Sequence, residues 1–187
     1  MEFESEKIDV QYKRPAVFLD RDGVLVTEKS YITSIKELDI FSYTAECIQQ
    51  IHQKGYYAIV ITNQSGVARG LFTEEQLQSM NEYLITQTSI DAVYYCPHHP
   101  EGLVSRYRKK CFCRKPQTAL FVTACNTFSI DMQKSYMVGD RASDIIAGKN
   151  VGVKTILLES GYGTAGLEID VVPDYVCDDL RNVINVL

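Results

Sequence analysis

Short apolar runs along this chain alternate with longer segments whose apolar residues recur at helical spacing. The short runs predict strands at Ala16–Leu19, Tyr57–Ile61, Ala92–Tyr95, Tyr136–Val138, Thr155–Leu158 and Tyr175–Val176. The longer segments predict helices at Thr44–Lys54, from Thr73, from Pro116, at Ser143–Lys149 and at Leu180–Val186. Because buried strands that alternate with helices form parallel sheets, we expect an α/β fold. The sheet should be open and covered by helices on both faces, as in three-layer Rossmann-like proteins.

Local signals mark the ends of three of these helices. Gly55 directly follows the first one, and glycine is a common C-terminal cap. The segment Thr73–Gln76 has the pattern of a capping box, in which two side chains bond to backbone N–H groups. Pro116 suits a first helical turn, where its missing N–H costs nothing. We therefore expect a helix to begin there and to carry Leu120 and Phe121 on its apolar side.

The length of 187 residues corresponds to about one domain. Residues 1–14 show no clear period, so we expect an N-terminal arm followed by one domain at 15–187. A predicted helix and strand already fill much of the interval between residues 22 and 62, so no separate cap domain fits there. The loop at 96–113 is unusual because it concentrates cysteine and histidine.

Charge and composition narrow the possible classes of function. The net charge is −5 and 45% of the residues are hydrophobic, as is ordinary for a globular protein. The acidic balance argues against a nucleic-acid or anionic-membrane partner. The apolar runs are too short to cross a bilayer, and the acidic residues 1–6 have no apolar signal-peptide core behind them. We therefore expect a cytoplasmic protein with reduced cysteines.

Two carboxylates follow the first predicted strand, in the segment Asp20-Arg21-Asp22-Gly23. Side chains two residues apart in a strand start on the same side, and Gly23 allows a tight turn away from it. One carboxylate can act as nucleophile on a phosphate ester while its neighbour transfers protons. The same residues also fit an ordinary Asx-type turn, so this motif alone leaves both interpretations open.

Three later segments carry further groups that phosphate chemistry needs. Thr62 heads the polar segment T-N-Q-S-G, whose hydroxyl and backbone amides can hold phosphoryl oxygens. Arg114 and Lys115 place two cations before a predicted helix. Asp140 and Asp144 follow the fourth strand and would form, with the first carboxylates, an oxygen-rich site for Mg2+. Each segment alone also fits a polar loop, a solvated basic turn or an N-cap. The four in this order on an alternating scaffold favour a phosphatase.

The loop at 96–113 holds Cys96, His98, Cys111 and Cys113. Three thiolates and one imidazole can form a tetrahedral zinc set, although this spacing is not the common paired C-x-x-C. Reduced cysteines in a polar loop are the alternative. The three other cysteines lie in apolar segments and are expected to be buried thiols.

D-x-D-G after the first strand, a strand-end threonine, a lysine before a helix and G-D-x-x-x-D resemble the four motifs of the haloacid dehalogenase superfamily of phosphohydrolases. The resemblance covers nearly the whole predicted domain and implies that Asp20 forms an aspartyl-phosphate. Asp22 resembles the general acid and base, and Thr62 and Lys115 resemble groups that steady the phosphoryl oxygens. Asp20, the backbone carbonyl of Asp22 and Asp140 resemble the Mg2+ ligands.

The spacing C-x-H-x12-C-x-C narrows the resemblance to the D,D-heptose 1,7-bisphosphate phosphatase family. The segments T-N-Q-S-G-V-A-R-G and C-x-C-R-K-P are also similar to that family. The resemblance implies a structural zinc ion held by Cys96, His98, Cys111 and Cys113. It implies substrate contacts at Arg21, Glu28, Lys29, Ser30, Tyr31, Asn63, Gln64, Ser65 and Arg114.

The implied reaction is Mg2+-dependent hydrolysis of D-glycero-D-manno-heptose 1,7-bisphosphate to the heptose 1-phosphate. Its product serves lipopolysaccharide biosynthesis or a nucleotide-activated heptose for another glycan, and we expect the protein to be a monomer. A histidinol-phosphate phosphatase is the alternative, since those related enzymes carry a similar cysteine–histidine cluster. Arg114 and the basic run at 106–110 favour the more anionic bisphosphate, although the run also fits a solvated face. A nucleic-acid end-processing phosphatase fits the acidic net charge poorly. A zinc-stabilised binding module without catalysis would not need the catalytic residues that are present.

Overall fold

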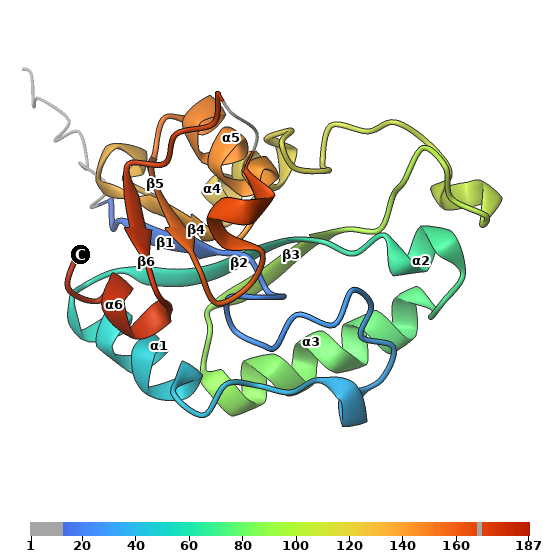
Figure 1. Ribbon diagram of the computed structural model, residues 1–187, viewed down its shortest axis with the longest axis horizontal. Helices are drawn as coiled ribbons and strands as arrows, with labels where there is room; N and C mark the ends of the chain where they lie inside the picture. Colours follow the sequence, from blue (N-terminus) through green and yellow to red (C-terminus); the bar gives the residue numbers. More distant parts are fainter. Residues whose placement is uncertain (1–12, 168–169) are drawn as a thin grey trace, which may run out of the picture.

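The computed structural model describes residues 13–167 and 170–187, so residues 1–12 of the predicted arm lie outside the described residues (Figure 1). Its strands are β1 (Ala16–Leu19), β2 (Tyr57–Asn63), β3 (Ala92–Cys96), β4 (Tyr136–Gly139), β5 (Lys154–Leu158) and β6 (Tyr175–Cys177). Its α-helices are α1 (Thr44–Gln53), α2 (Gly66–Arg69), α3 (Glu74–Thr88), α4 (Ala119–Thr127), α5 (Ala142–Val151) and α6 (Leu180–Val183). Short 3-10 turns occur at Ile35–Glu37, Ser105–Tyr107, Met132–Lys134 and Gly163–Gly166.

The six strands form one sheet in the order β3-β2-β1-β4-β5-β6, and every neighbouring pair is parallel. The predicted open parallel sheet is therefore confirmed. From β1 the chain first adds strands on one side, and it then returns to add β4 on the other. Ligands bind in such sheets beyond the carboxyl ends of the strands where the order reverses, which here lies between β1 and β4.

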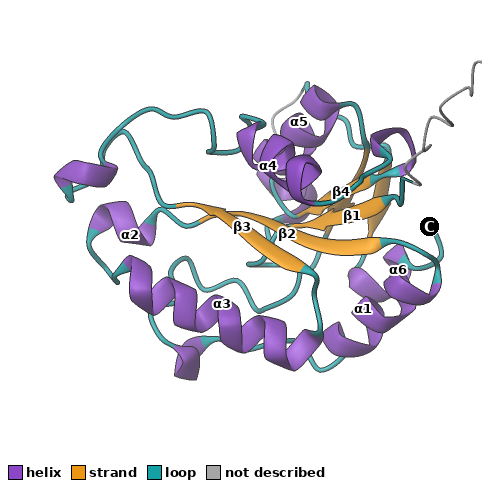
Figure 2. Ribbon diagram, turned by 180° about the vertical axis from the view of Figure 1, so that it is seen from behind, coloured by secondary structure: helices purple, strands orange, loops and turns teal. Residues whose placement is uncertain are grey.

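Helices cover both faces of the sheet, with α1, α3 and α6 on one side and α4 and α5 on the other (Figure 2). Successive residues of β1 serve the two layers in turn, as the pleat of a strand requires. Val17 and Leu19 pack in the core under α1, α3 and α6. Ala16 and Phe18 pack in the core under α4 and α5. Because both faces are buried at β1, β2, β4 and β5, these strands are continuous apolar runs in the sequence.

The predicted capping box at the start of α3 is confirmed. The hydroxyl of Thr73 accepts from the backbone N–H of Gln76 (3.2 Å), and the Gln76 side chain accepts from the backbone N–H of Thr73 (2.8 Å). The prediction that Pro116 opens a helix is wrong, because α4 begins only at Ala119. Pro116 follows a cis peptide bond within a turn that Gln117 closes by donating its N–H to the carbonyl of Arg114 (2.8 Å).

The last helix is shorter than the predicted Leu180–Val186, because α6 ends at Val183. Beyond it, the N–H of Val186 donates to the carbonyl of Val183 (2.9 Å), a three-residue spacing that belongs to tight turns. Arg14, the last residue of the predicted arm, is attached to the domain, since its Nε donates to the carbonyl of Gly55 (2.9 Å). Over residues 13–167 and 170–187, no helix combines the length and the apolarity that crossing a membrane requires.

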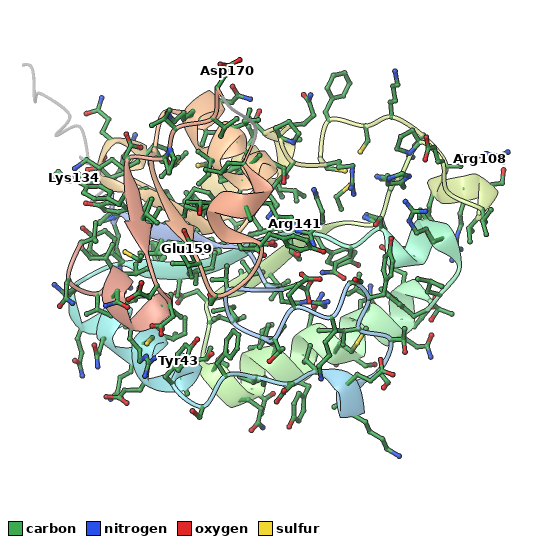
Figure 3. All side chains as sticks on the ribbon, in the orientation of Figure 1. Tyr43, Arg108, Lys134, Arg141, Glu159 and Asp170 are labelled. Carbon is green, nitrogen blue, oxygen red and sulfur yellow. The ribbon has the colours of Figure 1, made fainter. Side chains whose placement is uncertain are left out.

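The loop from β3 to α4 runs outward past α2 and returns to the sheet edge (Figure 1). A backbone bond from the N–H of Val104 to the carbonyl of Ala68 (2.9 Å) ties this loop to α2. Arg108 lies at the outer end of the loop, whereas Arg141 lies beside the strand ends (Figure 3). The loop therefore overhangs the edge of the sheet at which ligands are expected to bind.

Candidate active site and metal centres

The carboxyl ends of neighbouring strands bring an acidic cluster together. Asp20 and Asp140 directly follow β1 and β4, which are adjacent and parallel. The backbone N–H of Asp20 donates to the carbonyl of Val138 (2.9 Å) and joins the two strand ends. Asp20, Asp140 and Asp144 each offer a carboxylate oxygen, and these oxygens all lie within 4.8 Å of one another. Residues that are far apart in the sequence thus form one site, as predicted.

The turn after β1 needs glycine at position 23. Gly23 has a φ of 81°, which lies in the left-handed region that side chains disfavour. A Cβ atom at this position would also collide with the carboxylate of Asp140. The close approach of the turn to Asp140 therefore depends on the missing side chain, which explains the D-x-D-G pattern.

Lys115 is buried between two of the three carboxylates. Its Nζ lies 2.9 Å from Oδ1 of Asp20 and 2.7 Å from Oδ1 of Asp144, and it donates to the carbonyl of Ile61 (2.6 Å). Burial alone would lower the pKa of Lys115, but Asp144 and Asp20 outweigh that effect, so the pKa is raised. The ammonium group therefore stays charged. A fixed cation beside Asp20 offsets the repulsion between a carboxylate nucleophile and an anionic phosphate.

The side chain of Asn63 holds the backbone of Lys115 in place. Its Oδ1 accepts from the N–H of Lys115 (2.9 Å), and its Nδ2 donates to the carbonyl of Lys115 (3.1 Å). Asn63 is the last residue of β2, so this pair of bonds fastens the end of the β3–α4 loop to the sheet. Asn63 thus supports the lysine besides lining the cavity described below.

The acidic cluster carries more negative than positive charge. Burial raises the pKa of Asp140 to about 7, with added contributions from Asp20 and Asp144. Burial also raises the pKa of Asp144 to about 6, although Lys115 acts in the opposite direction. Oδ1 of each of the three aspartates is buried without a hydrogen-bond partner among the described residues, apart from the ion pairs of Asp20 and Asp144 with Lys115 and a 4.0 Å contact between Asp140 and Nε of Arg141. Buried anionic oxygens are suited to a hard cation, so these residues fit the predicted Mg2+.

Asp22 is held by two neighbouring side chains. Nη2 of Arg21 donates to Oδ1 of Asp22 (3.0 Å), and Nε2 of Gln64 donates to Oδ2 (2.8 Å). Gln64 also donates to the hydroxyl of Thr62 (3.0 Å) and accepts from Arg21 Nη2 (3.0 Å). Four residues predicted for the site, from the ends of β1 and β2, therefore form one hydrogen-bonded group.

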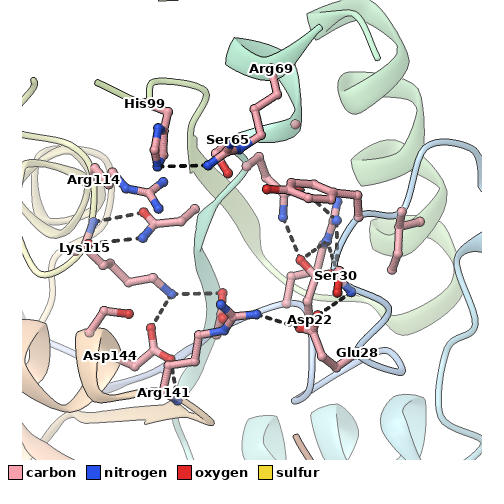
Figure 4. Close-up of a pocket in the computed structure, with 18 residues that line it drawn as sticks. Asp22, Glu28, Ser30, Ser65, Arg69, His99, Arg114, Lys115, Arg141 and Asp144 are labelled. Atoms are coloured by element: carbon pink, nitrogen blue, oxygen red, sulfur yellow. Dashed lines mark hydrogen bonds and ion pairs between the residues drawn. The ribbon is translucent and has the colours of Figure 1, made fainter. Parts of the chain in front are cut away.

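A cavity of about 300 Å³ opens above these residues (Figure 4). Most of the predicted catalytic and substrate-binding residues line it. They are Asp20, Arg21, Asp22, Glu28, Ser30, Tyr31, Asn63, Gln64, Ser65, Arg114 and Lys115. Thr62 and Asp140 do not line it in this structure, because they are buried behind the lining residues.

The side of the cavity opposite Asp22 is cationic (Figure 4). Arg69, His99 and Arg114 line it, with Nη2 of Arg69 lying 3.3 Å from Nε2 of His99. Nε of Arg69 is buried without a hydrogen-bond partner among the described residues. Burial lowers the pKa of His99, and Arg114 and Arg69 lower it further. Two guanidinium groups beside a neutral imidazole are suited to an anionic ligand.

Sequence reasoning missed Arg69, His99 and Arg141 as lining residues. Arg69 belongs to α2, a helix of four residues that is too short to show a period. His99 stands next to a predicted zinc ligand, and Arg141 follows a predicted magnesium ligand. Nη2 of Arg141 lies 3.2 Å from the carboxylate of Glu28, so these two residues form an ion pair at the cavity wall. The segment T-N-Q-S-G-V-A-R-G contained the signal for Arg69.

Two groups of basic residues lie outside the cavity. Lys29 donates to the carbonyl of Glu37 (3.1 Å) and lies 3.9 Å from Asp39. It is not among the residues that line the cavity, nor are the basic residues of the run at 106–110. Arg106 instead lies over the ring of Tyr107, at 4.6 Å from its centre. From the β3–α4 loop, the cavity receives the predicted Arg114 and Lys115 and also His99.

The cysteine–histidine loop closes on itself as a second candidate metal centre. The three thiols of Cys96, Cys111 and Cys113 lie 3.1–3.5 Å apart in pairs. Nδ1 of His98 lies 3.3 Å from the Cys113 sulfur and 3.7 Å from the Cys96 sulfur. Four soft or imidazole donors that converge in this way fit a tetrahedral zinc ion with no free coordination position. The predicted set is therefore brought together as a compact cluster.

The sheet and its acidic strand-end cluster define a hydrolase of the haloacid dehalogenase type. Residues 112–183 match the HAD-hydrolase-like family model. The chain is similar to the D-glycero-β-D-manno-heptose-1,7-bisphosphate 7-phosphatase of Haemophilus ducreyi, with 40% identity over 79% of this chain and 85% of the relative. It is 38% identical to the Escherichia coli K12 protein of the same name, over 90% and 91%.

Among solved structures, the fold is similar to that of a D,D-heptose 1,7-bisphosphate phosphatase from B. bronchiseptica in complex with magnesium and phosphate. The two chains share 28% sequence identity and superpose with a TM-score of 0.79, over 92% of this chain and 97% of the other. A protein of the same name from Burkholderia thailandensis is 26% identical, with a TM-score of 0.65 over 92% and 97%. The present chain belongs to the family of D-glycero-D-manno-heptose-1,7-bisphosphate 7-phosphatases.

Proposed function

We propose that this chain is a Mg2+-dependent phosphatase that converts D-glycero-D-manno-heptose 1,7-bisphosphate to the heptose 1-phosphate. The observation that carries the proposal is a cavity that has two features. Asp20, Lys115 and Asp144 meet at one part of it, and Arg69, His99 and Arg114 line another. The first group suits a reacting phosphate and the second suits a distal one. The names of the relatives add that the β anomer of the sugar is their substrate.

In the first half of the proposed reaction, a carboxylate oxygen of Asp20 attacks the phosphorus of the 7-phosphate. The bond from phosphorus to the sugar oxygen breaks, and Asp22 gives that oxygen a proton. Lys115 stays beside Asp20 and neutralises charge on the phosphoryl oxygens. Mg2+, held by Asp20, Asp140 and the carbonyl of Asp22, would supply further charge neutralisation when bound. Thr62 lies behind the cavity lining and supports the site through Gln64, whose Nε2 donates to its hydroxyl (3.0 Å).

In the second half, Asp22 takes a proton from a water molecule that attacks the phosphorus of the aspartyl-phosphate. The bond between phosphorus and the Asp20 oxygen breaks, which frees inorganic phosphate and restores the carboxylate. Dividing the reaction into two displacements lowers the barrier of each. Asp22 serves both halves because its carboxyl group reaches the cavity while Arg21 and Gln64 hold it.

We propose that the zinc ion has a structural role. Cys113 is two residues from Lys115, so the cluster fixes the chain just before the two cations that enter the cavity. Four protein ligands leave no position for water or substrate, which separates this metal from the chemistry. The loop then holds Arg114 in place as the group that recognises the distal phosphate, together with Arg69 and His99.

A panel of phosphate-release assays tests the proposed function. The substrates are both anomers of heptose 1,7-bisphosphate, histidinol phosphate and an aryl phosphate, each with and without Mg2+. We expect the highest kcat/KM on the β-bisphosphate and none of this activity without Mg2+. A preference for histidinol phosphate would refute the substrate assignment. The cationic wall does not favour that alternative, because Arg69 and Arg114 would repel an ammonium group.

We further propose that the protein is a cytoplasmic monomer. Zinc-binding thiols need a compartment that keeps cysteine reduced, and the cluster contains three of them. Light scattering during size-exclusion chromatography measures the mass, and a dimer would contradict this part of the proposal. Cell fractionation measures the location.

A further inference from the structure

The hydrogen-bonded group around Asp22 extends to a residue outside the cavity. Nη1 of Arg21 lies 3.5 Å from Oδ1 of Asn81, on α3. The side chain of Arg21 is only 1% exposed, and Asn81 is 5% exposed. Asn81 is not among the residues that line the cavity, so it makes no contact with a ligand there. Asn81 thus contacts Arg21, and Arg21 contacts Asp22, on the side of Asp22 that faces away from the cavity.

Asn81 is unusual on its helix. Its neighbours Leu77, Met80 and Leu84 form the apolar face of α3 in the core. Nδ2 of Asn81 is buried without a hydrogen-bond partner among the described residues. A buried amide with an unused donor is unfavourable, so an apolar residue would suit packing better. The contact that the residue does make is with Arg21, which points to a role in holding the guanidinium group.

The donors around Asp22 fix the position of its carboxyl group. Arg21 donates to Oδ1 and Gln64 donates to Oδ2, so both oxygens are held in place. In the proposed reaction, Asp22 exchanges a proton with the leaving oxygen in the first half and with the attacking water molecule in the second. A leaving group that needs no proton removes the first task, so its hydrolysis depends on the position of Asp22 only in the second half.

We infer that Asn81, Arg21 and Gln64 position Asp22 for hydrolysis of the phosphoenzyme, with Asn81 as a positioning residue that never touches the substrate. The inference rests on the proposed function. It changes the interpretation of Arg21, which sequence reasoning assigned to substrate binding. Gln64 donates to the carboxylate of Asp22 and to the hydroxyl of Thr62, so one side chain holds both residues in place.

The test separates the two halves of the reaction with 2,4-dinitrophenyl phosphate, whose leaving group needs no proton. For Asn81→Leu we expect kcat to fall roughly tenfold, while kcat/KM stays within about twofold of the parent. KM then falls together with kcat. Rapid mixing should show a burst of dinitrophenol, and acid-quenched protein should show phosphate attached to the chain by intact mass. For Gln64→Met we expect a larger fall in kcat, of roughly a hundredfold.

Asn81→Asp retains an oxygen acceptor for Arg21 and should restore kcat, which a general packing role would not explain. Gln78→Leu, an exposed position on the same helix, is the matched control and should behave as the parent. Equal losses in kcat and kcat/KM without accumulated phosphoenzyme, or no loss at all, would overturn the inference. If Asn81→Leu does not fold, Gln64→Met decides by the same criterion. A parent protein that hydrolyses no phosphate ester would instead refute the proposed function.

Discussion

Replacing Asp140 by asparagine should stabilise the protein without Mg2+ while abolishing its response to Mg2+. Asp140 is fully buried, close to the carboxylates of Asp20 and Asp144. Its pKa is raised by burial and by those neighbours from 3.8 to about 7. In the metal-free protein the charged form is therefore unfavourable, and Asp140→Asn removes that charge at nearly constant shape.

The magnitude follows from the raised pKa. Each pH unit between 3.8 and about 7 corresponds to about 1.4 kcal/mol, so the charge destabilises the folded state by roughly 4 kcal/mol at pH 8. The amide retains an oxygen for the N–H of Tyr162, which Asp140 Oδ2 now accepts at 3.0 Å. Since relaxation of the cluster absorbs part of the cost, we expect a gain of about 2 kcal/mol. For a chain of this length that is a rise of roughly 4–8 °C in Tm.

The sign of the pH dependence is also defined. The folded state holds its proton on Asp140 up to about pH 7, whereas the unfolded chain loses it near 3.8. Stability from this group is thus fully present below pH 3.8 and is lost as the pH rises through 7. The advantage of Asp140→Asn should therefore be largest at pH 8 and shrink towards pH 5.

Thermal unfolding in a chelator, at pH 8 and at pH 5, measures the effect, with Asp178→Asn as the exposed control. At a Mg2+ concentration of about 100 times Kd, the free energy of unfolding of the parent should rise by roughly 2.7 kcal/mol, whereas that of Asp140→Asn should hardly change. With Mg2+ present, the variant should therefore no longer be more stable than the parent. A chelated variant less stable than the parent at pH 8, or an effect equal at both pH values, would refute the electrostatic reasoning.

The remaining predictions concern the other parts of the site. Asp20→Asn keeps the shape but removes the attacking charge, so kcat should fall by several orders of magnitude in phosphate-release assays, and near-normal turnover would disprove the assignment. Elemental analysis should find about one zinc per chain in protein purified without added metal, and Cys111→Ser should lose it together with stability and activity. Full activity without zinc would exclude the structural role. Arg114→Ala should lose roughly 10- to 100-fold in kcat/KM on heptose 1,7-bisphosphate and far less on an aryl phosphate. Equal losses on both substrates would place Arg114 in the chemistry or the loop fold instead.

The features that sequence could predict are those set by neighbours along the chain. The central strands appeared as apolar runs because both of their faces are buried, and Thr73 and Gln76 form their capping box within one turn. The strand-end aspartates were predictable because parallel strands deliver their carboxyl ends to one edge. The helix start predicted at Pro116 was wrong because a proline in a turn and a proline in a first helical turn look alike in the sequence.

The features that sequence could not predict depend on contacts between distant segments. Arg69 enters the cavity only because the loop of the zinc ligands folds against α2 and brings His99 beside it. Lys29 turns away because the loop that follows it folds back and brings oxygen partners of Glu37 and Asp39 beside it, which no helical or strand period indicates. The support of Asp22 from Asn81 joins a strand end to a helix sixty positions away in sequence. No periodic pattern carries such information.

The attachment of Lys115 separates the part of the β3–α4 loop that carries the lysine from the part that contacts α2 and the outer wall of the cavity. Asn63 clamps the backbone of Lys115, and Cys113 belongs to the candidate zinc cluster only two positions before it. The stretch between His98 and Cys111 begins and ends at that cluster and lies outside the acidic centre. Its length and sequence can therefore change over evolution while the lysine keeps its place. A lineage that alters this stretch can acquire new substrates without rebuilding the machinery that cleaves the phosphate.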